Sequence, residues 1–336
     1  PQPLASPAPA TLKTNTLAAT GRLSVQRLEL NVFTLDYVDV TAAGESRTNL
    51  YFYQANQFVW KQHGMERNPW DSAVQYKDEL IAKTFPADSG FSVNYRFVIE
   101  GAVPPQLSIT IERADLYTVT CNGQPVKARS NAWWLDRAFP TIDLTATART
   151  GENVVTLTAR PFTILHEIEP AYVRGEFRLK PVDRGFVITP DEPLQAGGAD
   201  QAWDRQGHPF YSGAVAYRQS FQVERKGARA VVRLGDWRGS VARVRVNGDL
   251  AGYITAPPWQ LDVSNETVAG ANEVEVAVIG TLKNTLGPHH NHPSLGTAWP
   301  GMFQQGPKDG HPPGREYSTV GYGLFAPFTF EQLQSP

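Results

Sequence analysis

The feature that most constrains this fold is a unit that occurs twice. Residues 245–278 read RVNGDLAGYITAPPWQLDVSNETVAGANEVEVAV, and residues 120–159 read TCNGQPVKARSNAWWLDRAFPTIDLTATARTGENVVTLTA. Both run from a strand-like stretch into Asn-Gly, then through a tryptophan-bearing segment, an Asp-Leu or Asp-Val pair and a glycine turn to an alternating strand. Asn-Gly favours a two-residue hairpin turn, because both central residues of that turn need positive φ. The sequence therefore predicts two copies of one β unit.

Alternating apolar residues extend the strand pattern on both sides of each copy. In the first half they occur in SVNYRFVIEG and NVVTLTARPF, and in the second half in AVAYRQSFQV and NEVEVAVIG. Short strands at regular spacing with turn residues between them are typical of antiparallel sandwiches. Arg96 and Arg218 occupy matched positions in two of these strands, which favours structural ion pairs. The predicted fold class is mainly β, with two tandem antiparallel β-sandwiches.

Helical periodicity is confined to the N-terminal part of the chain. In NLYFYQANQFVWKQHG, Tyr51, Ala55, Phe58 and Val59 recur at three- and four-residue spacing, and Gly64 is placed to end a helix. One or two short helices are therefore expected near the N-terminus, packed against a sandwich.

The domain boundaries follow from composition and from the repeat. Residues 1–20 are rich in Pro, Ala and Thr and begin at Pro1, so they are interpreted as a linker in an excised piece or a processed product. Residues 21–180 are predicted to form the first sandwich with its strand and helix extension. Residues 181–336 are predicted to form the second.

Charge and cysteine content exclude several classes of function. Lys and Arg total 31 against 33 Asp and Glu, so no basic surface for nucleic acid is expected. Cys121 is the single cysteine, which rules out an internal disulfide and a cysteine-based metal site. No apolar run reaches the ~18 residues of a membrane span. No cofactor is predicted, and a structural calcium ion is left open.

The second half of the chain resembles a known family of domains. HPFYSGAVAYRQSFQV, VRVNGDLAG, WQLDVS, GANEVEVAV and the ending YSTVGYGLFAPFTFE resemble the galactose-binding-like jelly roll of glycoside hydrolase family 2 and its relatives. An aromatic-Ser-Gly-x-x-x-Tyr-Arg strand and a Val-Asn-Gly turn carry this resemblance. It covers residues 200–330 well and residues 90–165 more weakly.

This resemblance implies an ancillary part of a large bacterial glycoside hydrolase, for example of the α-L-rhamnosidase type. Its expected partners are a carbohydrate ligand and a neighbouring catalytic domain of the parent chain, and its expected location is extracellular or periplasmic. No alternating β/α series is present to form the catalytic barrel of such an enzyme. Carbohydrate binding or scaffolding without catalysis is the favoured function, and a purely structural buttress is the alternative.

An enzyme that acts on a polysaccharide is the third hypothesis. Hydrolysis needs two carboxyl groups about 5–9.5 Å apart. Turns or strand faces account for each candidate carboxylate, and Asp262 also matches Asp143 in the repeat. A Tyr/His pair capable of acid–base β-elimination is a further option. The residues considered were Asp204, Asp236, Asp262 and Glu273 for hydrolysis, and Tyr317 and Tyr322 with the histidines for elimination.

A long segment between the last two strands is the predicted ligand site. LGPHHNHPSLGTAWPGMFQQGPKDGHPPGREY spans residues 286–317 without regular periodicity, and such loops are usually functional or disordered. Its histidines lack the spacing of a metal site and are favoured as hydrogen-bonding groups. The rival interpretation is that the segment docks onto the first sandwich or the missing domain. The predicted ligand-binding residues are His289, His290, His292, Trp299, Trp259, Trp237 and Tyr253.

Overall fold

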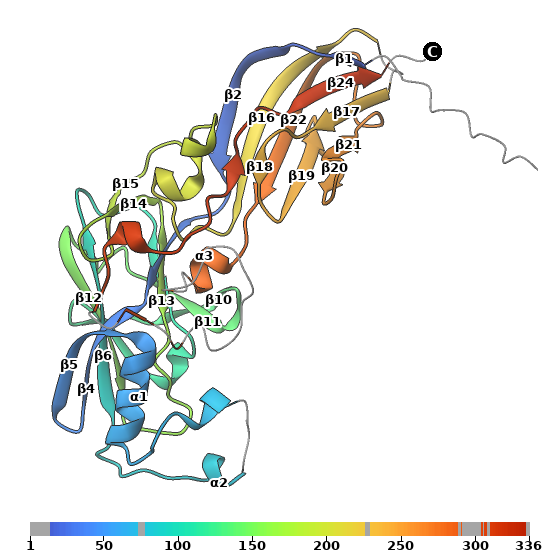
Figure 1. Cartoon of the computed structure of the whole chain (residues 1–336). Coiled ribbons are helices and arrows are strands. Elements are labelled where there is room, and N and C mark those ends of the chain that lie inside the picture. The colour runs from blue at the N-terminus through green and yellow to red at the C-terminus, as the bar shows by residue number, and fades with distance from the viewer. Residues whose placement is uncertain are drawn as a thin grey trace, which may run out of the picture.

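The computed structural model describes residues 14–72, 78–225, 229–287 and 310–333, together with residues 290, 304, 306 and 307. Antiparallel sheets dominate the fold, which confirms the predicted mainly β class. Two pairs of sheets lie toward opposite ends of an elongated molecule (Figure 1).

Helices are few and short. The predicted N-terminal helix is confirmed as α1, Phe52–Gln62, and Gly64 follows its end with a φ of 75°. Ala55, Val59 and Trp60 of α1 are buried in the first core, as the predicted spacing requires. The other described helices are α2 (Asp78–Ile81), α3 (Lys283–Leu286) and the 3₁₀ turns η1 (Pro69–Ser72), η2 (Ala114–Leu116), η3 (Ala199–Gln201), η4 (Trp203–Gln206) and η6 (Gly314–Glu316).

The first pair of sheets is built mainly from the first half of the chain. One sheet has the order β10-β11-β7-β13-β3, and the other contains β14-β15-β6-β12-β8-β9 with β4 and β5 added at β6. Their strands are β3 (Asn31–Leu35), β4 (Tyr37–Ala42), β5 (Glu45–Tyr51), β6 (Phe91–Ile99), β7 (Leu107–Thr110), β8 (Thr118–Cys121), β9 (Gln124–Pro125), β10 (Ala128–Trp134), β11 (Asp136–Asp143), β12 (Gly151–Ala159), β13 (Ala171–Gly175), β14 (Phe177–Pro181) and β15 (Phe186–Pro190).

The second pair of sheets is smaller. Its sheets have the orders β1-β24-β17-β21 and β2-β16-β22-β19-β20, and β18 pairs with β23 beside them. Their strands are β1 (Thr14–Thr16), β2 (Ala19–Arg27), β16 (Ala214–Val223), β17 (Arg229–Arg233), β18 (Trp237–Arg238), β19 (Val241–Val246), β20 (Asp249–Ile254), β21 (Gln260–Asp262), β22 (Gly270–Ile279), β23 (Gly323–Leu324) and β24 (Thr329–Leu333).

The two pairs of sheets share one pattern of strand neighbours. In the first pair, β4-β6-β12-β8-β9 is the counterpart of β2-β16-β22-β19-β20 in the second. In the opposing sheets, β3-β13-β7-β11 is the counterpart of β1-β24-β17-β21. The repeat deduced from the sequence is therefore present in the strand order.

The chain enters the second pair of sheets before it builds the first. Strand β1 pairs with β24, and β2 pairs with β16, so residues 14–27 belong to sheets whose other strands follow residue 213. The predicted boundaries put these residues in the linker and the first sandwich. Strand β2 alternates like its neighbours, and alternation does not say which distant sheet edge a strand will join. The first sandwich is thus inserted into the second.

Matched asparagines hold the two hairpins in the same way. Asn122 Nδ2 donates to Asn153 Oδ1 at 2.9 Å, and Asn247 Nδ2 donates to Asn272 Oδ1 at 3.0 Å. Asn153 and Asn272 each bond the backbone N–H and C=O of the residue four positions earlier. They are 0% and 1% exposed. The Asn of TGEN and the Asn of AGAN therefore tie the Asn-Gly hairpin to the turn before the closing strand.

We expect Asn153→Ala and Asn272→Ala each to lower the free energy of unfolding by about 1–3 kcal/mol, because each leaves several buried polar groups without partners. Urea denaturation would measure both losses. Asn265 is exposed, so Asn265→Ala is the matched control and should change stability by less than about 0.5 kcal/mol. Losses at Asn153 and Asn272 no larger than that of the control would contradict a structural role for the repeat.

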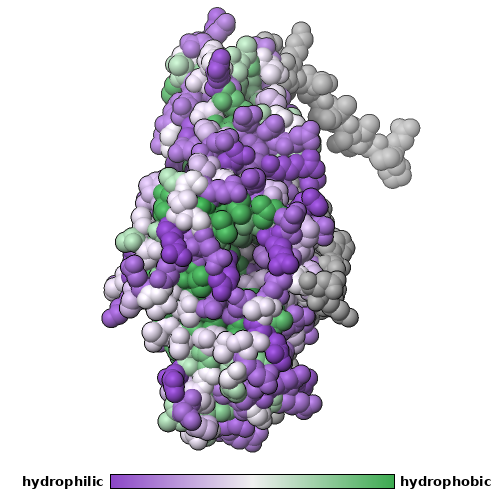
Figure 2. All heavy atoms as spheres, turned by 90° about the vertical axis from the view of Figure 1, so that its left-hand side faces the viewer, coloured by the Kyte–Doolittle hydropathy of each residue, from purple (hydrophilic) through white to green (hydrophobic). Residues whose placement is uncertain are grey.

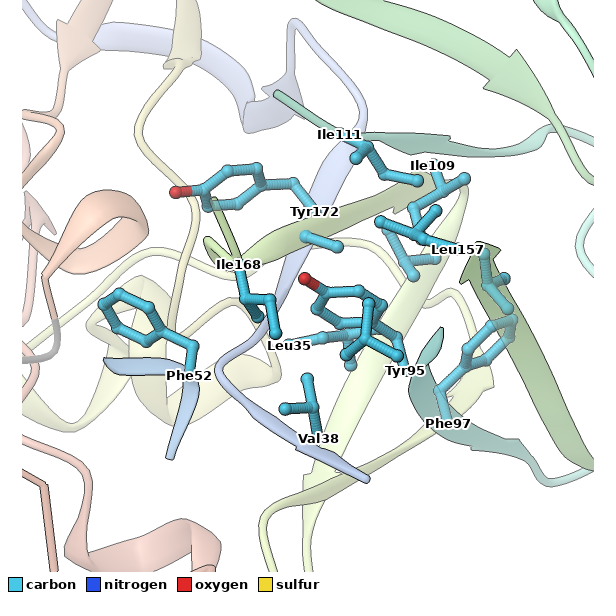
Figure 3. Close-up of a cluster of buried hydrophobic side chains, with 14 of the residues drawn as sticks. Leu35, Val38, Phe52, Tyr95, Phe97, Ile109, Ile111, Leu157, Ile168 and Tyr172 are labelled. Atoms are coloured by element: carbon cyan, nitrogen blue, oxygen red, sulfur yellow. The ribbon is translucent and has the colours of Figure 1, made fainter. Parts of the chain in front are cut away.

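Each pair of sheets encloses its own apolar core. Figure 3 shows part of the first core, where side chains from β3, β4, β6, β7, β12 and β13 meet, with Phe52 of α1 at one side. Tyr95 and Ile109 there are 1% and 0% exposed. The second core is centred on strands β16, β19 and β22 and includes Trp203, whose Nε1 donates to the Tyr217 hydroxyl at 3.0 Å.

Candidate functional site

Two tryptophans from neighbouring connections meet on the second sandwich. Trp237 begins β18, and Trp259 follows the Pro257-Pro258 pair before β21. Their ring centroids lie 5.3 Å apart at 87°, an edge-to-face arrangement typical of favourable aromatic pairs. Trp237 packs against the second core, whereas 36% of Trp259 is exposed. The ring of Trp237 is therefore held against the core, while the ring of Trp259 is accessible.

A third aromatic residue lies on the segment next to this pair. Tyr253 of β20 is 50% exposed. Its neighbour Gly252 faces Leu261, because a Cβ atom at Gly252 would lie 3.2 Å from Leu261 Cδ2. The end of β20 therefore runs beside the segment that carries Trp259. The structure thus brings the segments of three predicted ligand-binding residues together on one sandwich.

His290, the fourth predicted ligand-binding residue that the structure describes, is buried away from these aromatic residues. His290 is 3% exposed, and its Nε2 lies 2.9 Å from Oδ2 of Asp36, which is the residue between β3 and β4. The ring of His290 also packs edge-on against Tyr317, with centroids 4.7 Å apart. This burial favours the alternative that the long segment docks onto the first sandwich. The ligand role of His290 stays a prediction, and His289, His292 and Trp299 lie outside the described residues.

Asp36 is the centre of a buried polar cluster that we call the latch, composed of Asp36, His290, His311 and Tyr317. The Tyr317 hydroxyl lies 2.8 Å from Asp36 Oδ1 and 2.8 Å from His311 Nε2. Because a phenol has one proton, donation to Asp36 requires His311 to carry its proton on Nε2 and donate to Tyr317. His311 also stacks on Tyr37, with centroids 4.5 Å apart at 8°. The contacts with Asp36 and Tyr37 thus join His290, His311 and Tyr317 to the first sandwich.

The latch contains the Tyr/His pair required by the elimination hypothesis, but its environment is unsuitable for a base. Burial and the charge of Asp36 raise the pKa of Tyr317 well above its usual value, so the phenol keeps its proton near neutral pH. Burial lowers the pKa of His311, which keeps that imidazole neutral. Tyr317 is only 7% exposed. Tyr322 bonds Thr281 instead, with 2.6 Å between the two hydroxyls.

Two of the four carboxylates considered for hydrolysis, Asp262 and Asp204, have hydrogen-bond partners of their own. Asp262 pairs with Arg229 at 2.7 Å and accepts from the Ser264 backbone, and a hydrogen bond to Ser264 is the main reason for its lowered pKa. Asp143 in the other copy likewise accepts from the Thr145 backbone. Asp204 accepts from Thr319 at 3.1 Å. Asp236 and Glu273 lie in the turn before β18 and in β22, respectively.

The matched arginines form the expected ion pairs. Arg96 bonds Asp39 and Glu152, both at 2.6 Å, and Arg218 bonds Glu275 at 2.8 Å. Within the described part of the chain, no group of three or more His, Cys, Asp or Glu side chains could hold a metal ion. In the same residues, no helix combines the length and apolar character needed to cross a membrane.

Comparison with known proteins finds similarity to glycoside hydrolases. No family model matches the chain. A protein of Formosa agariphila named "Putative beta-glucuronidase" is 34% identical over 88 residues, which are 25% of this chain and 8% of that protein. The chain therefore spans a small fraction of the curated relative that it matches.

Two solved structures illustrate the structural similarity. A rhamnosidase from Novosphingobium sp. PP1Y is 20% identical and has a TM-score of 0.29, with 72% of this chain and 23% of that chain covered. A β-D-mannosidase from Dictyoglomus thermophilum is 8% identical, also with a TM-score of 0.29, over 74% of this chain and 31% of that chain. The three similar proteins are thus named as a glucuronidase, a rhamnosidase and a mannosidase.

Proposed function

We propose that this chain is a non-catalytic carbohydrate-binding or scaffolding part of a larger glycoside hydrolase. The observation that carries the binding role is the Trp237–Trp259 pair, in which one ring is anchored in the core and the other is accessible. Sugar rings offer apolar C–H faces that stack on an exposed indole. Tyr253 is a further exposed aromatic side chain of the same sandwich, on β20 of the opposing sheet.

Two further observations support the absence of catalysis in this part of the protein. The candidate carboxylate Asp262 and its counterpart Asp143 act in ion pairs and turns at equivalent places in the two copies. The Tyr317–His311 pair is buried and is held by the charge of Asp36. In addition, the sequence similarity covers only 8% of a much longer glucuronidase-named protein, in which other regions have room for a catalytic site.

We expect Trp259→Ala to weaken binding to a neutral oligosaccharide about tenfold, because a sugar face that covers about 60 Å² of apolar surface on the indole gains about 1.5 kcal/mol at roughly 25 cal/mol per Å². Affinity electrophoresis in gels that contain soluble polysaccharides would identify the ligand and measure the change. The melting temperature should fall by a few degrees, because the variant loses the edge-to-face contact with Trp237, which is worth about 0.5–1.5 kcal/mol. Trp133→Ala, which removes a 52%-exposed indole from the first sandwich, is the matched control.

The results of this experiment separate the rival functions. Retardation by no glycan, or equal loss with Trp133→Ala and Trp259→Ala, would remove the binding role and leave the structural buttress. Turnover of an aryl glycoside that disappears on substitution of one Asp, Glu or His would overturn the non-catalytic role. The buttress alternative is favoured by the latch, because that cluster uses the predicted ligand loop to join the two sandwiches.

A further inference from the structure

A cavity of about 590 Å³ lies where the two sandwiches meet. Strands β14 and β15 contribute one side, while η4 and η6 with their flanking residues contribute the other. Figure 2 shows the side of the molecule on which β14 and β15 lie in Figure 1, and there hydrophobic and strongly hydrophilic residues meet midway along its length. The volume is within the range of about 300–1,000 Å³ that is common for small-molecule sites.

The cavity combines buried apolar residues with polar ones. Leu179, Phe186 and Tyr317 are 3%, 8% and 7% exposed, and the rings of Phe186 and Tyr317 meet edge-to-face at 5.4 Å. Thr189 and Thr319 contribute hydroxyl groups. Buried apolar side chains beside a few polar groups are the usual composition of a pocket that orients a polar ligand.

Cationic side chains outnumber anionic ones in this lining. The cations are Arg178, Lys180, Arg205 and Arg315, and the anions are Glu192 and Asp204. The whole chain has a formal net charge of −2, so this excess is local. Four cations against two carboxylates favour a negatively charged ligand. The two carboxylates can in turn accept hydrogen bonds from hydroxyl groups of that ligand.

These cations are available to a ligand, because the carboxylates that pair with them are exposed. Arg178 pairs with Glu192, Lys180 with Glu100, and Arg205 with Asp200, and the partner carboxylates are 71%, 46% and 92% exposed. Such exposed pairs contribute only about 0–1 kcal/mol, so a ligand carboxylate can replace the partner at small cost. Arg315 is exposed and forms no ion pair within the described ranges.

We infer that this cavity binds a carboxylate-bearing sugar, such as a uronate residue of an acidic oligosaccharide. Arginine suits this ligand because its planar guanidinium donates two parallel hydrogen bonds to one carboxylate. In this arrangement Arg315 and Arg178 bind the carboxylate, while Asp204 and the threonines bond ring hydroxyls. The inference deepens the proposed function by naming a sugar class, and its site is separate from Trp259.

Isothermal titration of the whole chain with trigalacturonic acid tests the inference, with neutral galactotriose as the comparison. The acidic trisaccharide should bind, and its affinity should fall as salt is raised. Arg315→Ala should weaken binding about tenfold, as expected for loss of one charge-assisted hydrogen-bonded contact. Arg315→Lys should fall between the wild type and Arg315→Ala. The neutral trisaccharide should not respond to either substitution at this site.

Arg137 offers a matched control, since it is exposed and also forms no ion pair within the described part of the chain. Arg137→Ala should leave binding of trigalacturonate unchanged. Equal weakening by both alanine variants would show a general charge effect and overturn the assigned site. Absence of trigalacturonate binding would overturn it as well. Loss of neutral-glycan binding on Trp259→Ala would still support the proposed function, so the two failures are distinguishable.

Discussion

Asp36→Ala is expected to lower the free energy of unfolding by about 2–6 kcal/mol, because it leaves two buried hydrogen-bond donors without an acceptor at about 1–3 kcal/mol each. The side chain of Asp36 is 3% exposed and accepts hydrogen bonds from His290 and Tyr317 at 2.9 and 2.8 Å. Alanine would leave both donors buried without a partner. It would also remove the hydrogen bonds by which Asp36 holds His290 and Tyr317 to the first sandwich.

Urea denaturation followed by tryptophan fluorescence would measure this loss. Glu152→Ala provides the control, because Glu152 pairs with Arg96 at the surface and the two side chains are 58% and 46% exposed. Its loss should be at most about 1 kcal/mol. Tyr317→Phe should give an intermediate loss, since it removes one of the two hydrogen bonds to Asp36. If Asp36→Ala and Glu152→Ala proved equally mild, the latch would have no structural role.

The repeat was predictable because its signals are local. Asn-Gly specifies a hairpin from two adjacent residues, and both Asn122 and Asn247 have the positive φ that this turn requires. The matched arginines were predictable for the same reason, since alternation along one strand places Arg96 and Arg218 on equivalent faces. Short-range rules therefore gave the sheet pattern and the structural role of these residues.

The inserted arrangement of the sandwiches was not predictable from such rules. Strand β2 pairs with β16, about 190 residues later, as in the pair Ser24–Arg218. The latch has the same origin, because Asp36 and Tyr317 are 281 residues apart in sequence. Pairing between distant segments depends on which edges and cavities remain open after both sandwiches form. No local pattern contains that information.

The candidate site was predictable only in part. The accessible ring of Trp259 follows from its place in the turn-rich stretch APPWQ, yet its contact with Trp237 required the fold. His290 illustrates the opposite case, since a histidine in a polar Gly/Pro-rich loop is expected at the surface and is instead buried beside Asp36. The cationic cavity is assembled from Arg178, Arg205 and Arg315, and no single stretch of sequence suggests it.

Stability is expected to fall between about pH 7 and pH 5, before most carboxylates titrate. Burial is the main cause of a lowered pKa at three histidines, and for His208 the pKa falls to about 3. In the unfolded chain the same imidazoles bind protons near their ordinary value of 6.5. The unfolded state therefore takes up more protons as pH falls below 6.5, and stability decreases until the folded-state pKa is reached. The three residues are His166, His208 and His311.

His208 should dominate this loss because its surroundings oppose a second proton most strongly. Its Nδ1 lies 2.9 Å from the Gln206 carbonyl oxygen, to which it donates, and its other nitrogen accepts from Arg27. Protonation of that nitrogen would remove the acceptor and place two cations together, although Asp191 lies 3.8 Å away.

Urea denaturation at pH 7, 6 and 5 should show a slope of up to about 1.4 kcal/mol per pH unit for each such histidine. His208→Gln should be less stable than the wild type at pH 7, and the difference should shrink toward pH 5, because the variant no longer loses the His208 contribution. Parallel curves for the two proteins would show that His208 takes no part in the pH dependence.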